Sequence, residues 1–177
     1  MKTLIIVIHP QMETSLINRR WVEELNKFPE KYVVHQLYEA YPDEMIDVKK
    51  EQELIEMHNR IIFQFPFYWF SSPPLLKKWL DEVLLHDWAF GSRSGYKVGG
   101  KKIALAISTG IDDKGFSAEG MYKYTIEELT RPFELTFDYI RADYRKPFVY
   151  YGLEQDVSHE WIQRSVPLYL GFIDGLI

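Results

Sequence analysis

The sequence predicts an α/β fold in which a parallel β-sheet carries helices on both faces. Two observations indicate this class. Apolar runs such as Thr3–Ile8 are continuous rather than alternating, which is typical of parallel strands covered on both faces. Amphipathic helical patterns separate these runs, so strands and helices alternate along the chain. A length of 177 residues fits one domain over residues 1–177, because a chain of this size buries enough surface to be stable.

Five strands and five helices are expected, in the sheet order 2-1-3-4-5 that is common at this size. The first helix is expected to begin at Thr14-Ser15, whose hydroxyls can cap it. Pro73-Pro74 fit the first turn of another helix, and Pro132 interrupts a later one. The expected strands are Thr3–Ile8, Tyr32–Leu37, Ile61–Phe65, Lys102–Ser108 and Arg145–Tyr151, and the helices after the first are Asp47–His58, Leu75–Leu85, Thr125–Ala142 and Ser158–Ile177.

Composition excludes several classes of function. The chain has no cysteine, which excludes disulfides, zinc-thiolate sites and cysteine nucleophiles. A net charge of −5 without a long basic cluster disfavours a nucleic-acid partner. The histidines lack metal-ligand spacing and Asp112-Asp113 is typical of a solvated turn, so no metal site is expected. No apolar run approaches the length of a membrane span, and we expect a cytoplasmic protein.

Three loops should meet at the carboxyl edge of the sheet, beside its first and third strands. The loop His9–Asn18 is polar and opens a helix, an arrangement that suits a phosphate. The loop Pro66–Phe70 contains four consecutive aromatic residues and suits a flat ring. The loop Ser108–Ile111 offers backbone N–H donors. A flavin needs all three features, so these residues favour flavin binding.

Other interpretations of the same residues stay open. The aromatic run could cover the core or form a subunit contact, because aromatic residues are enriched at interfaces as well as in ligand pockets. The first loop lacks the Gly-x-Gly-x-x-Gly and Gly-Lys-Ser/Thr patterns, so a Rossmann or P-loop site is not supported. Ser15 and Ser108 lack a Gly-x-Ser-x-Gly elbow, which argues against a hydrolase.

Four stretches carry a resemblance to a known family. The most specific runs from Pro66 to Trp79 with the pattern Pro-x-x-Trp-x-x-x-Pro-x-x-Leu-Lys-x-Trp. The others are Ile8-His9-Pro10 with Thr14-Ser15-x-x-Asn18, Ser108-Thr109-Gly110, and Pro147–Gly152. Together they resemble the flavodoxin-like NAD(P)H:quinone oxidoreductases, which include DT-diaphorase, bacterial general-stress oxidoreductases and the ancillary flavoproteins of potassium efflux systems. The resemblance covers essentially the whole chain and implies a flavodoxin-like fold.

The resemblance also implies a cofactor and its contacts. FMN is expected, with FAD as the alternative, because no residues dedicated to an adenine are evident; NAD(P)H is the implied co-substrate. The first loop would contact the phosphate, the second the ring edge and ribityl chain, and the third the pyrimidine end. The implied cofactor-binding residues are His9, Thr14, Ser15, Asn18, Pro66, Phe67, Tyr68, Trp69, Phe70, Ser108, Thr109, Gly110, Ile111 and Phe116.

The expected catalytic groups stabilise negative charge at the N1 and O2 edge of the flavin. They are the backbone N–H groups of Gly110 and Ile111 and the phenol of Tyr122. Phe116 and Tyr122 stand where DT-diaphorase-like members carry a Tyr and a His. The chain therefore departs from the family at its histidine proton donor.

Two roles follow from the resemblance, and the sequence does not separate them. The first is an enzyme that passes a hydride from NAD(P)H through flavin N5 to a quinone-like acceptor, with ping-pong kinetics because one open site serves both substrates. The second is a regulatory subunit that binds a membrane potassium-efflux protein. A homodimer is expected in either case, because the loop Trp88–Tyr96 is long and aromatic and suits a partner-facing wall.

Overall fold

The sheet of the computed structural model, which describes residues 2–155 and 157–176, has the expected order. The strands follow the path β2-β1-β3-β4-β5, and β6 also pairs with β4. Every strand pair is parallel, so the chain leaves each strand at the same edge of the sheet. The strands are β1 Thr3–Val7, β2 Tyr32–Gln36, β3 Arg60–Pro66, β4 Lys102–Ser108, β5 Asp143–Tyr144 and β6 Phe148–Tyr150.

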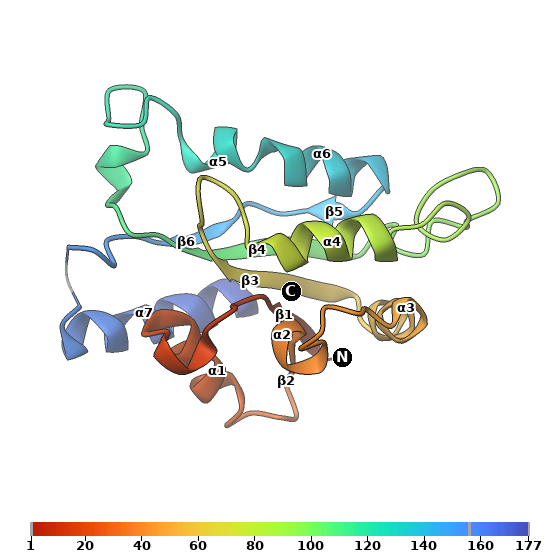
Figure 1. Ribbon diagram of the computed structural model, residues 1–177, viewed down its shortest axis with the longest axis horizontal. Helices are drawn as coiled ribbons and strands as arrows, with labels where there is room; N and C mark the ends of the chain where they lie inside the picture. The colour runs from red at the N-terminus through yellow and green to blue at the C-terminus, as the bar shows by residue number, and fades with distance from the viewer. Residues whose placement is uncertain (1, 156, 177) are drawn as a thin grey trace.

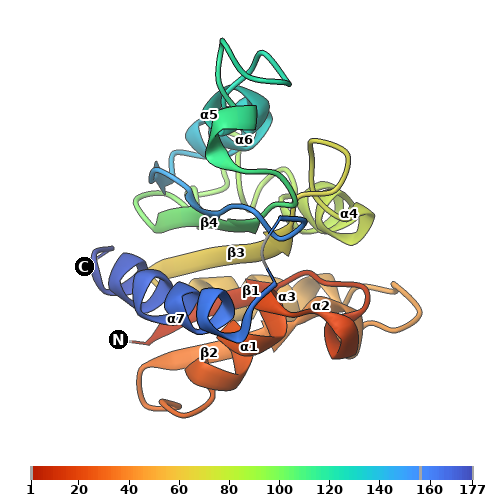
Figure 2. The same ribbon diagram turned by 90° about the vertical axis from the view of Figure 1, so that its left-hand side faces the viewer.

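Helices cover both faces of this sheet (Figures 1 and 2). Figure 2 shows α1 and α7 on one side and α3 and α4 on the other, and each side has its own apolar cluster. The loops that follow β1, β3 and β4 lie toward the left of Figure 1, and the segment 84–101 lies at the right. The helices are α1 Ile17–Leu25, α2 Leu37–Ala40, α3 Val48–Glu56, α4 Pro74–Val83, α5 Ile126–Leu129, α6 Arg131–Tyr139 and α7 His159–Asp174.

The structure corrects three details of the expected elements. Of the last strand, expected as one run over Arg145–Tyr151, only β6 is a strand; β5 lies before that run and was not expected, and Pro147 lies between the two because it has no N–H for the ladder. The first helix begins at Ile17, two residues after Ser15, whose Oγ still accepts a hydrogen bond from Asn18 N at 3.1 Å. The short helix α2 was not expected. The expected end of the last helix, Ile177, lies outside the described residues.

A buried carboxylate ties helix α3 to the sheet and to α4. Glu51 is fully buried, and its carboxylate contacts His35 Nε2 at 2.7 Å and accepts hydrogen bonds from Tyr41 Oη at 2.7 Å and Trp79 Nε1 at 2.8 Å. Burial raises the pKa of Glu51, but the hydrogen bonds from these partners outweigh it, and the resulting pKa is below the usual value for glutamate. The charged form of Glu51 therefore stabilises the fold.

Acid is expected to remove this stabilisation. Because the folded-state pKa of Glu51 is lowered, its contribution is present above the unfolded pKa of about 4.3 and is lost as pH falls through the folded value. Glu51→Gln should lower the free energy of unfolding by about 1–3 kcal/mol at pH 7 and by less at pH 3. Urea unfolding at both pH values measures the difference. Glu53→Gln, on the exposed side of the same helix, is the control, and an equal loss at both pH values for Glu51→Gln would contradict the prediction.

Candidate functional site

The loop after β1 forms a cradle of donors at the start of α1. Ser15 Oγ accepts from Asn18 N, and the N–H groups of Leu16 and Ile17 have no hydrogen-bond partner within the described residues. Free N–H groups at a helix start, together with hydroxyls, bind anions such as phosphate. Thr14 lies in a short 3₁₀ turn, Met12–Thr14, and its hydroxyl donates to Gln11 O at 3.2 Å.

His9 presents a neutral donor to this cradle. Gln11 N–H donates to His9 Nδ1 at 3.1 Å, so Nδ1 is an acceptor and the ring proton of the neutral imidazole is on Nε2. Burial lowers the pKa of His9 below its usual value, which favours this neutral form. The ring packs edge-on against Tyr68, with centroids 6.4 Å apart. The aromatic loop thereby fixes the orientation of the histidine.

A buried chain of hydrogen bonds connects the three loops beneath the cradle. Asn18 Nδ2 donates to Ser108 Oγ at 2.9 Å, and Gln64 Nε2 donates to both Asn18 O and Asn18 Oδ1 at 3.2 Å. Tyr169 Oη on α7 donates to Gln64 Oε1 at 2.9 Å. All four side chains belong to buried residues. The side-chain amide of Asn18 therefore makes its hydrogen bonds inside the protein, where it holds the first loop against the third.

The aromatic loop after β3 is a strained two-residue turn. Tyr68 and Ser71 exchange two backbone hydrogen bonds of 2.9 Å, with Trp69 and Phe70 between them at φ 48° and 61°. Two consecutive left-handed residues define a type I′ turn, which normally carries Asn and Gly. Non-glycine residues in this region cost about 1–2 kcal/mol each and collect at functional sites. The turn places Trp69 at its tip, where the side chain is 93% exposed.

Behind the tip, a cluster of rings supports the aromatic loop. Phe70 contacts Tyr122 with centroids 4.9 Å apart, and Tyr122 contacts Phe116 at 4.9 Å. Phe116 in turn lies 6.1 Å from Phe67 and 6.0 Å from Tyr151. The Tyr122 hydroxyl has no hydrogen-bond partner within the part of the chain that the structure describes. Phe116 is buried and supports the other rings, whereas Tyr122 is half-buried and keeps a free phenol.

The loop after β4 uses its carbonyls inside the protein but leaves two of its N–H groups unused within the described residues. Leu153 N donates to Thr109 O at 3.0 Å, Glu154 N to Gly110 O at 2.8 Å, and Gly152 N to Ile111 O at 3.1 Å. The N–H groups of Gly110 and Ile111 have no partner among residues 2–155 and 157–176. This arrangement can stabilise negative charge on a ligand.

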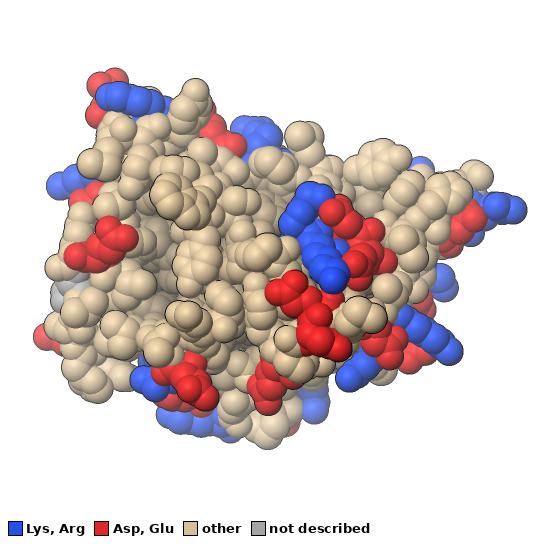
Figure 3. Space-filling view, viewed as in Figure 1, with Lys and Arg blue, Asp and Glu red and all other residues tan. Residues whose placement is uncertain are grey.

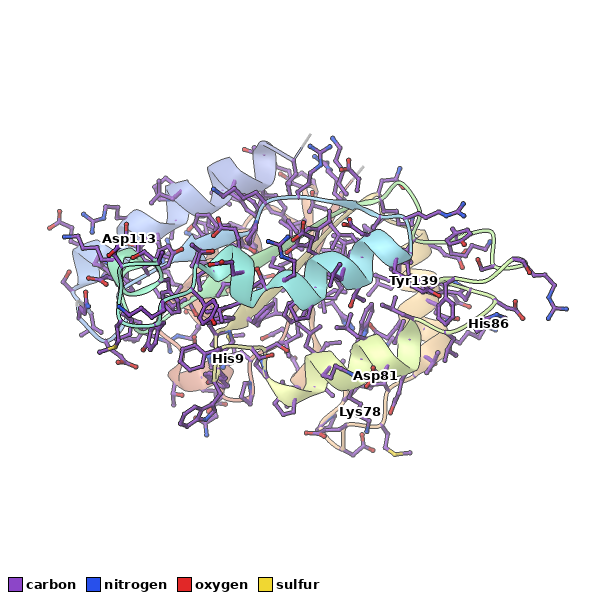
Figure 4. The ribbon with its side chains drawn as sticks, turned by 90° about the horizontal axis from the view of Figure 1, so that it is seen from above. His9, Lys78, Asp81, His86, Asp113 and Tyr139 are labelled. Carbon is purple, nitrogen blue, oxygen red and sulfur yellow. The ribbon has the colours of Figure 1, made fainter. Side chains whose placement is uncertain are left out.

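Residues after β1, at the end of β3 and at the end of β4 line one cavity, which brings together only part of the predicted site. The predicted residues outside its lining are Phe67, Trp69, Phe70, Thr109, Gly110, Ile111, Phe116 and Tyr122. A cavity of about 290 Å³ is lined by His9, Thr14, Ser15 and Asn18 together with Pro66, Tyr68 and Ser108. Leu153 and Val157 close its far side. Figure 3 shows a broad area without Lys, Arg, Asp or Glu between the left rim and a charged cluster right of centre. In Figure 4, His9 lies between the ends marked by Asp113 and His86.

Several residues of the site were missed by sequence reasoning. Gln64 is a polar residue within an otherwise apolar strand, and that interruption is a signal that could have been used. Tyr169 and the brace 152–154 carry no local signal, because they reach the site only through the packing of α7 and β6. Glu154 also lies directly against Gly110, where an added Cβ would come within 2.4 Å of Glu154 Oε1.

Comparison with known proteins decides the family. A family profile described as "Flavodoxin-like fold" matches residues 1–166. The chain belongs to this flavodoxin-like family. The chain is also 51% identical over 152 residues to the uncharacterized NAD(P)H oxidoreductase YrkL of Bacillus subtilis, covering 86% of each. It is 36% identical to the potassium-efflux ancillary protein KefG of Pectobacterium atrosepticum, covering 94% of this chain and 95% of KefG.

Solved structures of similar proteins share the fold of this flavodoxin-like chain. The crystal structure of general stress protein 14 from Treponema denticola, in complex with FMN, superposes with a TM-score of 0.95 at 43% identity and full coverage of both chains. An NADPH-quinone reductase from P. pentosaceus superposes with a TM-score of 0.86 at 31% identity, covering 98% of each chain.

No group of three or more His, Cys, Asp or Glu side chains within 2–155 and 157–176 is placed to hold a metal ion. Among the helices of that same part of the chain, none has the length and apolar character needed to cross a membrane.

Proposed function

We propose that this protein is an FMN-dependent NAD(P)H:quinone oxidoreductase. The observation that carries the proposal is the cavity at the ends of β1, β3 and β4, which is lined by Leu16 and Ile17 with their free N–H groups. The loops beside it carry two further unused groups outside the lining, which are the exposed ring of Trp69 and the free N–H groups of Gly110 and Ile111. These groups fit a phosphate, a flat ring and an electron-rich ring edge respectively. FMN is favoured over FAD because FMN is bound in the general stress protein 14 structure.

Each group of the chain then has a role toward FMN. His9 Nε2–H, Ser15 and the start of α1 hold the phosphate, and Asn18 positions this loop through Ser108. Thr14 lines the same cavity, and Pro66 closes it beside Tyr68. Trp69 and Phe70 would lie along the ring. Phe70 contacts Tyr122, and Tyr122 contacts Phe116, which also lies beside Phe67. The loop Ser108, Thr109, Gly110 and Ile111 would face the pyrimidine end, and the free phenol of Tyr122 would be a further donor.

FMN, when bound, supplies the capacity to accept a hydride from NAD(P)H at N5 and to pass it to a quinone-like acceptor. The protein orients the two substrates and stabilises negative charge, through the N–H groups of Gly110 and Ile111. The tip of the aromatic loop would cover one side of the ring, so the other side would serve both substrates in turn. The kinetics are therefore ping-pong. The cytoplasm suits this activity, because it is a reducing compartment that supplies NAD(P)H.

Reconstitution with FMN tests the proposal. The purified protein, saturated with FMN and separated from excess, is expected to show flavin absorbance at one FMN per chain and to reduce a water-soluble quinone with NADH or NADPH. Parallel double-reciprocal lines are the expected kinetic result. A protein that retains neither FMN nor FAD would refute the proposal, and intersecting lines would refute the shared site.

We also propose that the protein forms a homodimer through the face of α4 and α6. A groove of about 1000 Å³ runs between these helices and is lined by Phe70 of the aromatic loop, Phe90 of the long loop, and apolar residues of α6. Leu135 and Tyr139 on α6 are 61% and 67% exposed. Figure 4 shows Asp81 of α4 and Tyr139 of α6 on this one face. A second copy on this face would cover these apolar residues and place its own surface beside the flavin.

Leu135→Lys is expected to convert the dimer to a monomer, because it places a charge in the apolar contact. Light scattering at micromolar concentration measures the mass. Leu168→Lys is the matched control, since Leu168 is 52% exposed on α7, on the other face of the sheet. A monomeric wild-type protein with bound FMN and full activity would contradict the dimer.

A regulatory role is the second candidate, and the likeness to KefG favours it. In this role the flavin fold binds a membrane potassium-efflux protein, and catalysis is secondary. Co-purification with membranes that contain such a transporter, measured beside quinone turnover in the same preparation, separates the two roles. Turnover without association supports the enzyme, and association without turnover supports the regulatory subunit.

A further inference from the structure

The side chain of Glu154 lies directly against Gly110, in the loop that follows β4. A Cβ built on Gly110 would come within 2.6 Å of Glu154 Cδ and 2.9 Å of Glu154 Cγ, and closer still to Glu154 Oε1. The φ of Gly110 lies outside the left-handed region, so the backbone gives no separate reason for a glycine there. The missing side chain of Gly110 therefore leaves the space in which the Glu154 carboxylate lies.

Two backbone hydrogen bonds keep this carboxylate beside the loop. Glu154 N donates to Gly110 O at 2.8 Å, and the preceding Leu153 N donates to Thr109 O at 3.0 Å. Leu153 also lines the cavity of about 290 Å³ at the candidate FMN site. The segment that carries Glu154 is thus bonded to the same loop whose free N–H groups belong to Gly110 and Ile111.

No cation neutralises the Glu154 carboxylate within the part of the chain that the structure describes, where it has neither an ion pair nor a hydrogen bond. The surroundings of Ile111 are also acidic. This residue lines a second cavity, of about 770 Å³, whose charged lining residues are three acids and one cation: Asp112, Asp113, Glu119 and Lys114. Glu154 therefore adds a negative charge to a part of the surface that is already negative.

We propose that Glu154 makes the bound FMN a stronger hydride donor by opposing the negative charge of its reduced state; this inference rests on the proposed function. A hydride from NAD(P)H brings two electrons and one proton, so the flavin ring gains one negative charge at its N1 and O2 edge, and NAD(P)⁺ leaves. The N–H groups of Gly110 and Ile111 attract this charge, and the Glu154 carboxylate repels it. Transfer of the hydride to a quinone, which takes a second proton from water, removes the charge again.

The repulsion acts on the reduction potential of FMN. It destabilises reduced FMN relative to oxidised FMN, and so it lowers the potential of the bound cofactor. The phosphate of FMN is present in both states, so its own repulsion by Glu154 largely cancels in this comparison. Glu154 is exposed, and water therefore screens part of the effect. A lower potential extends the reaction to quinones that are weaker oxidants.

The midpoint potential of bound FMN tests the proposal, measured by anaerobic spectral titration against a redox dye of known potential. Glu154→Gln keeps the size of the side chain and removes its charge. This variant should raise the potential by about 30 mV, which corresponds to a tenfold greater preference for reduced over oxidised FMN. Glu154→Lys should raise it further, because it reverses the charge, and Glu154→Asp should stay closer to the wild type than Glu154→Gln.

Glu30→Gln is the matched control. Glu30 is an exposed acid just before β2, at the opposite edge of the sheet, and its replacement changes the net charge equally. This control should keep the wild-type potential, and added salt should reduce the difference between the wild type and Glu154→Gln.

Wild-type potentials in both Glu154→Gln and Glu154→Lys, with FMN bound, would overturn the role of Glu154 and leave the proposed function intact. An equal rise in Glu30→Gln would show an effect of net charge and would also overturn this role. A protein that binds no FMN would overturn both proposals. Circular dichroism confirms that the variants are folded.

Discussion

Replacing Gln64 by leucine is expected to lower the free energy of unfolding by about 3–5 kcal/mol and to weaken FMN binding at least about tenfold. The loss removes both hydrogen bonds to Asn18 and leaves the Tyr169 hydroxyl unpaired in the interior, where an unsatisfied polar group costs about 1–3 kcal/mol. Asn18 then no longer holds Ser108 and the phosphate loop in one arrangement. Urea unfolding without FMN and fluorescence titration with FMN measure the two effects.

Tyr169→Phe is the milder companion of this variant. It removes one hydrogen bond of the chain and leaves the contacts between Gln64 and Asn18 in place, so a loss of about 1–2 kcal/mol and a smaller change in FMN affinity are expected. If both variants lost stability equally while FMN affinity stayed at the wild-type value, the buried chain would be structural only. The role of Asn18 as a positioning residue would then be wrong.

Replacing Trp69 by asparagine is expected to move stability and FMN affinity in opposite directions. Trp69 is 93% exposed and left-handed, so little packing is lost, and asparagine adopts this conformation more readily than tryptophan. The free energy of unfolding of the FMN-free protein should rise by about 0.5–1 kcal/mol. FMN affinity should fall at least about tenfold, because the ring loses an aromatic contact and its cover.

Trp69→Phe is the complementary variant, because it keeps an aromatic ring at the same position. Phenylalanine keeps an aromatic cover but not the preference for a left-handed backbone, so it should retain most of the FMN affinity and gain no stability. Thermal unfolding without flavin and FMN titration are the two measurements. Wild-type affinity in Trp69→Asn would show that this side chain does not cover the ring, and a loss of stability in the same variant would show that the turn is not strained.

The sequence by itself determined the architecture and predicted the edge of the sheet at which the candidate site lies. Continuous apolar runs predicted all of the central strands, because a parallel strand that is buried on both faces has apolar residues at consecutive positions. The position of the loops after β1, β3 and β4 followed from the parallel order alone, since all of these strands end at one edge. The family motif from Pro66 to Trp79 added the prediction that the loop after β3 binds a flat ring.

The roles of individual polar groups depended on the tertiary structure. Asn18 and Ser108 are 90 positions apart, and Gln64 and Tyr169 are 105 positions apart. No local sequence pattern therefore indicates that these side chains form hydrogen bonds with one another. The N–H groups of Gly110 and Ile111 were expected as donors from the sequence, but only the structure shows that they have no partner within the described residues, whereas the brace 152–154 bonds the carbonyls of the same loop. Periodicity reports whether a residue is buried, but a hydrogen-bond partner is chosen by the distance and direction that long-range packing imposes.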